Sequence, residues 1–121
     1  MPKVAAFEVV SSRVDKIPPS DMEVYSFNLP HNVCHQDSDP PVVVMVTFNV
    51  VKANDLKWEI VVNDRTESQF YYSGDFVFTW QLFPDASQFH PGENQIAVAA
   101  KRSGSGIIEV TGIVLHYRIE I

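Results

Sequence analysis

Cysteine and clustered positive charge are nearly absent from this sequence of 121 residues. Cys34 is the only cysteine, so no disulfide can form within the chain, which is typical of a reducing compartment. No basic run is longer than the pair Lys101-Arg102, and the net charge is -6. Nucleic-acid binding needs a concentrated basic face, so we expect no nucleic-acid partner.

Long hydrophobic segments are missing as well. The longest apolar run, Val42–Val46, has the length of a strand, whereas a helix that spans a membrane needs about 20 apolar residues. Near the amino terminus, Glu8 and Arg13 interrupt any hydrophobic region of the kind a signal peptide requires. We therefore expect no membrane span, and a protein that is cytoplasmic or is exported by a route without a leader.

Leucine is also scarce, with 4 residues, whereas valine and isoleucine number 18 and 8. β-Branched side chains suit the pleated surface of a strand and lose rotamer freedom in a helix. The run from Ile113 to Ile121 alternates between apolar and polar residues, and the run from Phe76 to Leu82 places aromatic residues at every second position. Both patterns have the period of two that is typical of strands.

Further strands are expected at Val4–Val14 and Met22–Leu29, with shorter ones at Gln69–Tyr72 and Asn94–Ala100, and Trp58–Val62 alternates in the same way. Turn signals separate them, including Asn54-Asp55, Asn63-Asp64, Ser73-Gly74-Asp75, Pro91-Gly92 and Ser103-Gly104-Ser105-Gly106. The sequence thus predicts one all-β domain over residues 1–121, an antiparallel β-sandwich or barrel of about seven to nine strands.

The segment Val42–Val51 is apolar on both faces until Thr47 and Asn49. Antiparallel sheets commonly leave one face in contact with water, so a doubly apolar strand indicates a second covered surface. The same pattern occurs in Ile107–Leu115. We expect a homo-oligomer or a protein partner on this basis.

The second half of the chain carries a series of connected features. The strand Leu56–Val62 ends in Asn63-Asp64, the step Pro91-Gly92-Glu93-Asn94 leads into another strand, and a hydrophobic strand follows at Ile107–Tyr117. This half resembles the galactose-binding-like jelly-roll domains, although Asp64 stands where many relatives have glycine. The resemblance implies a jelly-roll topology and a non-catalytic module that binds sugars through loops at one end, often with calcium nearby.

Candidate sugar-binding residues lie around the turn signals of this half. A sugar site needs a flat aromatic face beside amides, carboxylates and cations that bond to hydroxyls. We expect such a site on an aromatic loop and the preceding turn, formed by Asn63, Asp64, Arg65, Tyr71, Tyr72 and Asp75. In the alternative arrangement, Phe70 and Tyr72 pack inward and only Tyr71 is exposed.

A metal site is a second hypothesis. The loop before Pro40-Pro41 contains His31, Cys34, His35, Asp37 and Asp39, and His90 could approach it from another loop. Zinc is disfavoured because the loop has no second cysteine. Calcium prefers oxygen ligands, so Asp37 and Asp39 are its candidate ligands. The alternative is a solvated polar loop without metal.

Catalytic signatures are missing from the sequence. It has no G-x-S-x-G elbow, no phosphate-binding glycine loop, no H-E-x-x-H and no H-x-H pair of the cupin type. His116 lies on the outer face of the last predicted strand. The resemblance of the second half, with the candidate residues around Tyr71, implies a non-catalytic, lectin-like carbohydrate-binding module. An assembly module that acts through homo-oligomer or protein contacts is the alternative.

Overall fold

The computed structural model describes residues 3–30, 42–82 and 88–120, and most of them lie in strands. The strands are β1 (Lys3–Ser11), β2 (Asp15–Ile17), β3 (Met22–Leu29), β4 (Val42–Val62), β5 (Arg65–Leu82), β6 (Gly92–Ala100) and β7 (Ser105–Glu120). All pairs are antiparallel, which confirms the predicted all-β class.

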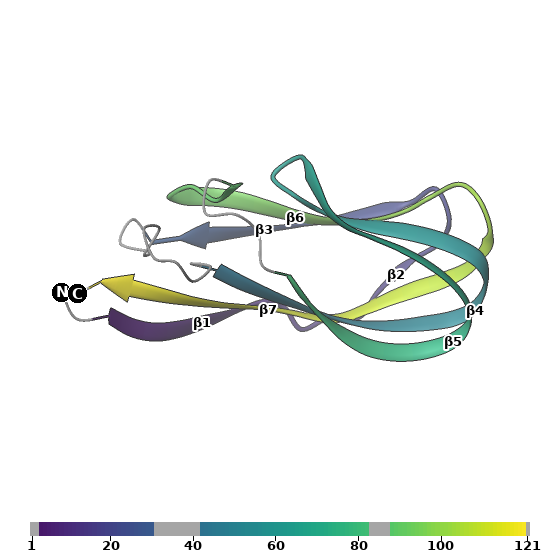
Figure 1. Ribbon diagram of the computed structural model, residues 1–121, viewed down its shortest axis with the longest axis horizontal. Coiled ribbons are helices and arrows are strands. Elements are labelled where there is room, and N and C mark those ends of the chain that lie inside the picture. The colour runs from purple at the N-terminus through teal and green to yellow at the C-terminus, as the bar shows by residue number, and fades with distance from the viewer. Residues whose placement is uncertain (1–2, 31–41, 83–87, 121) are drawn as a thin grey trace.

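The strand pairs are nested in the manner of a jelly roll. The outermost pair is β1 with β7, the next is β3 with β6, and the innermost is the hairpin of β4 and β5. β4 also pairs with β7 through its first half and with β6 through its second half. Two layers result, which Figure 1 shows one above the other.

The first layer contains β1, β2, β7, the first half of β4 and the second half of β5. The second layer contains β3, β6, the second half of β4 and the first half of β5. The long hairpin of β4 and β5 therefore passes from one layer to the other at the end of the molecule opposite both termini (Figure 1).

This bend corrects the prediction of turns at Asn54-Asp55 and Ser73-Gly74-Asp75. Both segments lie inside continuous strands, at shifts of register where Lys52, Asp55 and Gly74 have positive φ. The bulges leave backbone N–H groups outside the ladder, and β5 side chains accept their bonds. Asp75 Oδ1 accepts from the Lys52 N–H, and Ser73 Oγ accepts from the Asp55 N–H at 2.9 Å.

Alternating residues of the long strands form the core between the layers. Every second residue from Val42 to Val50 has no exposed surface, and Ile113 and Leu115 of β7 are equally buried. The predicted inward face of the last strand is thereby confirmed, with Tyr117 and Ile119 packed at its edge.

Within the described strands, β5 pairs only with β4, and its two halves meet through their side chains. The ring of Phe70 lies 5.9 Å from that of Phe78 and 5.1 Å from that of Trp80, between ring centroids. Tyr72 stacks on Phe76 at 5.0 Å. We call these five rings the aromatic seam. Phe76 and Trp80 form its outer rim, each 42% exposed.

The glycines after β6 allow β7 to approach the bend of β4, which leads to a prediction for stability. Gly104 has φ +85°, and a Cβ there would collide with the Asp55 carbonyl group, whereas Gly92, at φ +90°, has open space around it. We expect Gly104→Ala to lower the free energy of unfolding by about 3 kcal/mol and Gly92→Ala by about 1 kcal/mol, since only the first adds a collision to backbone strain. Chemical denaturation measures both, and equal losses would contradict the close approach.

Candidate functional site

An exposed tyrosine surrounded by polar side chains lies on the outer face of the second layer. Tyr71 of β5 pairs with Lys57 of β4, and Gln69 pairs with Glu59. Cross-strand partners project from the same face of a sheet, so these four side chains are neighbours. Lys101, which follows β6, extends the group through an ion pair of 2.9 Å with Glu59. We call these five residues the Tyr71 surface.

The ring of Tyr71 is held in place although it is 60% exposed. Its hydroxyl group donates a hydrogen bond to Asp55 Oδ1 at 2.5 Å. The ammonium group of Lys57 lies 5.4 Å from the ring centroid, within the range of a cation–π contact. The bond to the Asp55 carboxylate and its negative charge raise the pKa of the Tyr71 hydroxyl above the ordinary value of 10.0.

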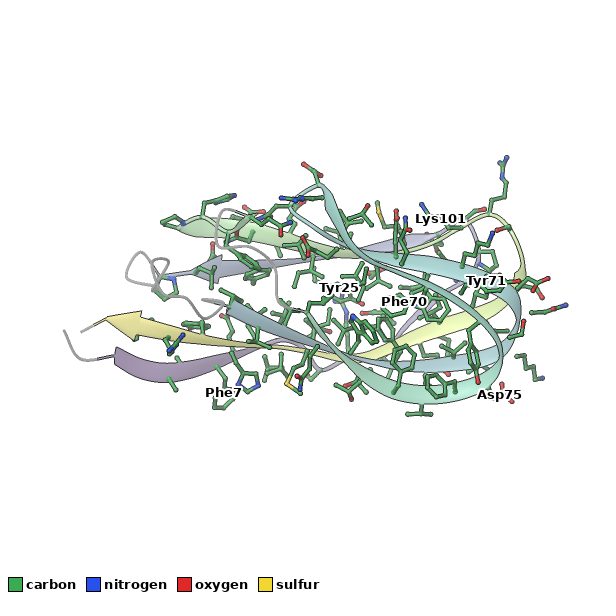
Figure 2. The ribbon with its side chains drawn as sticks, in the orientation of Figure 1. Phe7, Tyr25, Phe70, Tyr71, Asp75 and Lys101 are labelled. Carbon is green, nitrogen blue, oxygen red and sulfur yellow. The ribbon has the colours of Figure 1, made fainter. Side chains whose placement is uncertain are left out.

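Two depressions adjoin this ring. One, of about 340 Å³, is lined by Lys57, Gln69 and Lys101, and the other, of about 520 Å³, by Asn54, Asp55 and the segment 103–105. Figure 2 shows Tyr71 and Lys101 at the same end of the molecule. An aromatic face beside amide, ammonium and carboxylate groups provides the contacts that a saccharide ring and its hydroxyls require.

The structure separates the other residues of the predicted aromatic loop from Tyr71. The loop is part of strand β5, so Tyr72 points to the opposite face and joins the aromatic seam. Phe70 also points inward (Figure 2). Asp75 lies at the bend and accepts the Lys52 N–H. The observed burial matches the alternative arrangement, in which Tyr71 alone is exposed.

Asn63, Asp64 and Arg65 lie at the other end of the hairpin. Asn63 and Asp64 form a two-residue turn between the paired residues Val62 and Arg65, with φ of 46° and 67°. Positive φ at both positions is typical of a type I′ turn, which asparagine and aspartate tolerate. Arg65 is six strand residues from Tyr71, about 20 Å along an extended chain, so one sugar ring cannot bridge them.

The turn borders a polar cleft of about 560 Å³, lined by Asn63, Asp64, Arg65, Gln88, His90, Glu93 and Gln95. The side-chain amide of Asn63 already forms hydrogen bonds within the fold. Its Oδ1 accepts from the Gln95 N–H at 2.8 Å, and its Nδ2 donates to Asn94 Oδ1 at 2.9 Å. Asp64 and Arg65 are exposed at the cleft, and their role in ligand binding stays a prediction.

Asn94 is the buried centre of this network, with 1% exposure. Its Nδ2 donates to the carbonyl groups of His90 and Gly92, and its Oδ1 accepts from the His90 N–H at 3.1 Å as well as from Asn63. Every hydrogen-bonding site of the amide is therefore used, and the turn at Pro91-Gly92 is tied to the β4–β5 turn.

The proposed calcium ligands Asp37 and Asp39 lie outside the described residues, as do His31, Cys34 and His35. Across the ranges that the structure describes, no three His, Cys, Asp or Glu side chains are grouped to hold a metal ion. The same ranges contain no helix that is long and apolar enough to cross a membrane.

Asp55, Lys57 and Lys101 were not predicted as neighbours of Tyr71. The only sequence feature that could have indicated these neighbours is the Asn63-Asp64 turn, because a hairpin turn sets which residues of its two strands face each other. A register shift after Ile60 changes this pairing, so the turn alone would have placed Lys57 opposite Phe70 instead of Tyr71.

No protein-family model and no characterised protein sequence matches the chain. Several solved structures nevertheless have a similar fold. Dimeric latent PorU from Porphyromonas gingivalis has a TM-score of 0.65 at 7% identity, over 98% of this chain and 13% of that one. A β-porphyranase of glycoside hydrolase family 86 from Bacteroides plebeius has a TM-score of 0.62 at 12% identity, over 97% and 21%. The xylan-binding module CBM15 has a TM-score of 0.55 at 14% identity, over 92% and 76%.

At these identities the likeness shows the fold alone. The chain spans about an eighth of PorU and about a fifth of the porphyranase, and it covers most of the xylan-binding module. The chain has a jelly-roll β-sandwich fold that carbohydrate-binding modules also have, as the resemblance of its second half implied.

The buried amide network leads to a second prediction. We expect Asn94→Ala to lower the free energy of unfolding by about 3 kcal/mol, because it leaves buried polar groups without partners. The matched control is Asn28→Ala, at an exposed position of the neighbouring strand β3, which we expect to change stability by at most about 0.5 kcal/mol. Thermal or denaturant unfolding compares them, and similar losses would refute the role of Asn94.

The bond between Tyr71 and Asp55 leads to a third prediction. Asp55→Asn removes the carboxylate that disfavours the phenolate, so the pKa of Tyr71 should fall back toward 10.0. Ultraviolet absorbance of the phenolate during an alkaline titration measures this, and Tyr71→Phe identifies which step belongs to Tyr71. A titration that is the same with and without the Asp55 carboxylate would show that the bond does not form in solution.

Proposed function

We propose that this chain is a non-catalytic carbohydrate-binding module that holds a saccharide on the Tyr71 surface. The observation that carries the proposal is the fixed and exposed Tyr71 ring, with hydrogen-bonding groups on both sides of it. The fold shared with a xylan-binding module supports the class of ligand at the level of architecture only.

Each part of the surface has a distinct task in this proposal. The apolar face of Tyr71 packs against the C–H groups of a sugar ring. Gln69 can both donate to and accept from hydroxyl groups, and Lys57 and Lys101 donate to sugar oxygens. Glu59 holds Lys101 through their ion pair, so it fixes the direction of that donor.

The Tyr71 surface is prepared for binding before a ligand arrives. Asp55 and Lys57 fix the ring, so little side-chain freedom is lost on association. One aromatic contact contributes only about 0.5–1.5 kcal/mol beyond the buried area, so we expect weak binding of a single saccharide unit. A glycan chain that also reaches the depression beside residues 103–105 would bind more tightly.

The fourth prediction concerns the contribution of the Tyr71 ring to binding. The ligand is a soluble oligosaccharide that a glycan array has first identified. In titration calorimetry we expect Tyr71→Ala to weaken binding by at least about tenfold, and Tyr71→Phe to retain most of it, because the ring remains. The matched control is Phe7→Ala, which removes an exposed aromatic ring from the outer face of the other layer. Binding that survives Tyr71→Ala, or is lost equally with Phe7→Ala, would place the site elsewhere.

The same array, run with calcium and with EDTA, tests the predicted metal. Binding that is lost in EDTA would support calcium at Asp37 and Asp39, and binding in both arms would leave the Tyr71 surface as a site without calcium. An array without any saturable ligand would contradict the carbohydrate proposal. Assembly through contacts between copies, the alternative from the sequence, concerns a different surface and does not depend on glycan binding.

A further inference from the structure

The two depressions beside Tyr71 differ in the charges that line them. The smaller one, of about 340 Å³, is lined by Lys57, Trp58, Gln69, Phe70, Tyr71 and Lys101. Two of these residues carry a positive charge and none carries a negative one, although the chain has 15 acidic and only 9 basic residues. The larger depression, by contrast, includes the carboxylate of Asp55. We call the smaller one the lysine depression.

Lys101 keeps hydrogen-bond donors for a ligand although it forms an ion pair. Its ammonium nitrogen lies 2.9 Å from Glu59 Oε1. A lysine ammonium group has three N–H donors, and this pair uses one of them. The side chain of Lys101 is 48% exposed, whereas that of Glu59 is 14% exposed. The remaining donors of Lys101 are therefore open to a ligand, and the carboxylate that holds the ammonium group is largely covered.

Lys57 carries a charge that is not balanced in an ion pair. None of the ion pairs among the described residues includes it. Its ammonium group lies 5.4 Å from the centroid of the Tyr71 ring, and a cation–π contact leaves the charge in place. Two acids flank Lys57 on β4, and each has another partner. Glu59 pairs with Lys101, and Asp55 accepts the Tyr71 hydroxyl.

Trp58 adds a donor without an acceptor at the buried side of the lysine depression. The residue is 2% exposed, and its ring stacks on that of Phe70 at 5.1 Å between centroids. The indole Nε1–H has no hydrogen-bond partner in the described part of the chain. The positive end of this dipole is therefore uncompensated, and in a region of low dielectric constant it favours a negative group nearby.

We infer that the saccharide on the Tyr71 surface is acidic, and that its carboxylate or sulfate group lies in the lysine depression. This inference rests on the proposed function, because it names the class of sugar for the same site. The Tyr71 ring packs against the sugar, and the ammonium groups of Lys57 and Lys101 donate to the charged oxygens. Charge-assisted hydrogen bonds are roughly twice as strong as neutral ones, so an acidic group gains more here than a hydroxyl group.

The difference between the two depressions also sets the direction of the glycan. Asp55 lines the larger depression, where an acidic group would face a like charge. Asn54 and the segment 103–105 offer neutral groups there, which suit the hydroxyls of a neutral sugar unit. Glu67, the acid at the bulge of β5, is four residues from Tyr71, about 13 Å along the strand. At physiological salt its charge is largely screened at that distance.

A glycan array with matched neutral and acidic forms tests the inference on the chain of 121 residues. One set of pairs is uronic-acid oligosaccharides with their methyl esters, and the other is sulfated oligosaccharides with their desulfated forms. For the pair that binds best, titration calorimetry at low ionic strength should show about tenfold tighter binding of the acidic form. Comparison of the two sets shows whether a carboxylate or a sulfate is preferred.

Two lysine variants make the experiment specific. Lys57→Gln and Lys101→Gln each replace a cation by an amide that still donates, so the ratio of acidic to neutral affinity should fall to about threefold or less. The ratio is the readout, because both lysines also donate to neutral sugars in the proposed function. The matched control is Lys16→Gln, which removes the same charge from an exposed position of β2 in the other layer. It should leave the ratio unchanged.

Salt provides an independent measurement. Between ionic strengths of about 0.01 M and 1 M the screening length falls from about 30 Å to about 3 Å. Attraction between exposed charges weakens accordingly, so the preference for the acidic form should fall at least about threefold over this range. The neutral form contains no charge, and its affinity should change much less.

Four results would overturn the inference. They are equal binding of the acidic and neutral forms, a preference that both lysine variants leave intact, a preference that Lys16→Gln removes equally, or acidic binding that survives Tyr71→Ala. The last result would show a general attraction of anions to the lysines. Equal binding of both forms would leave the carbohydrate proposal standing, whereas an array without any saturable ligand would contradict both.

Discussion

The closure of the sandwich on the β5 side is the constraint on which the other features of this structure depend. β5 follows β4 through both layers, and in the described strands it has a hydrogen-bonded neighbour on one side only. Its two halves face each other across the gap between the layers, where no backbone ladder can join them. The aromatic seam supplies the closure instead: Phe70 from one layer meets Phe78 and Trp80 from the other, and Trp58 stacks on Phe70 from the core side at 5.1 Å.

The seam also determines what the outer surface presents. Successive side chains of a strand point to opposite faces, so fixing Phe70 and Tyr72 inside fixes Tyr71 outside, between them. The bend contributes in the same way. Its bulges place Asp55 within reach of the Tyr71 hydroxyl, and Ser73 and Asp75 are consumed in satisfying the backbone of the bend. The candidate sugar surface is therefore the exterior of the same packing that closes the fold.

Much of the fold follows from the sequence because burial has a simple period in a strand. The alternation in Ile113–Ile119 predicted the inward face that the structure has, whereas in Phe76–Leu82 only Phe78 and Leu82 pack against the core and Phe76 and Trp80 stay half exposed. Bends and bulges were not predictable in the same way. Asn54-Asp55 and Ser73-Gly74-Asp75 have the composition of turns, and local composition cannot tell a turn that ends a strand from a bulge that bends one. Of the residues in the proposed Tyr71 surface, the sequence indicated only Tyr71 as a binding residue, because the others become its neighbours through strand register.

The register shift after Ile60 shows why this information is missing. Val61 pairs with Thr66, but Ile60 pairs with Ser68, so Glu67 is an extra residue on β5. Without it, Phe70 would lie opposite Lys57 on the outer face and Tyr71 would point into the core. A polar hydroxyl would then enter a position filled by a phenyl ring, and the seam would lose Phe70. The energy of the aromatic contacts thus selects the bulge, and the bulge in turn selects the one tyrosine that the surface displays.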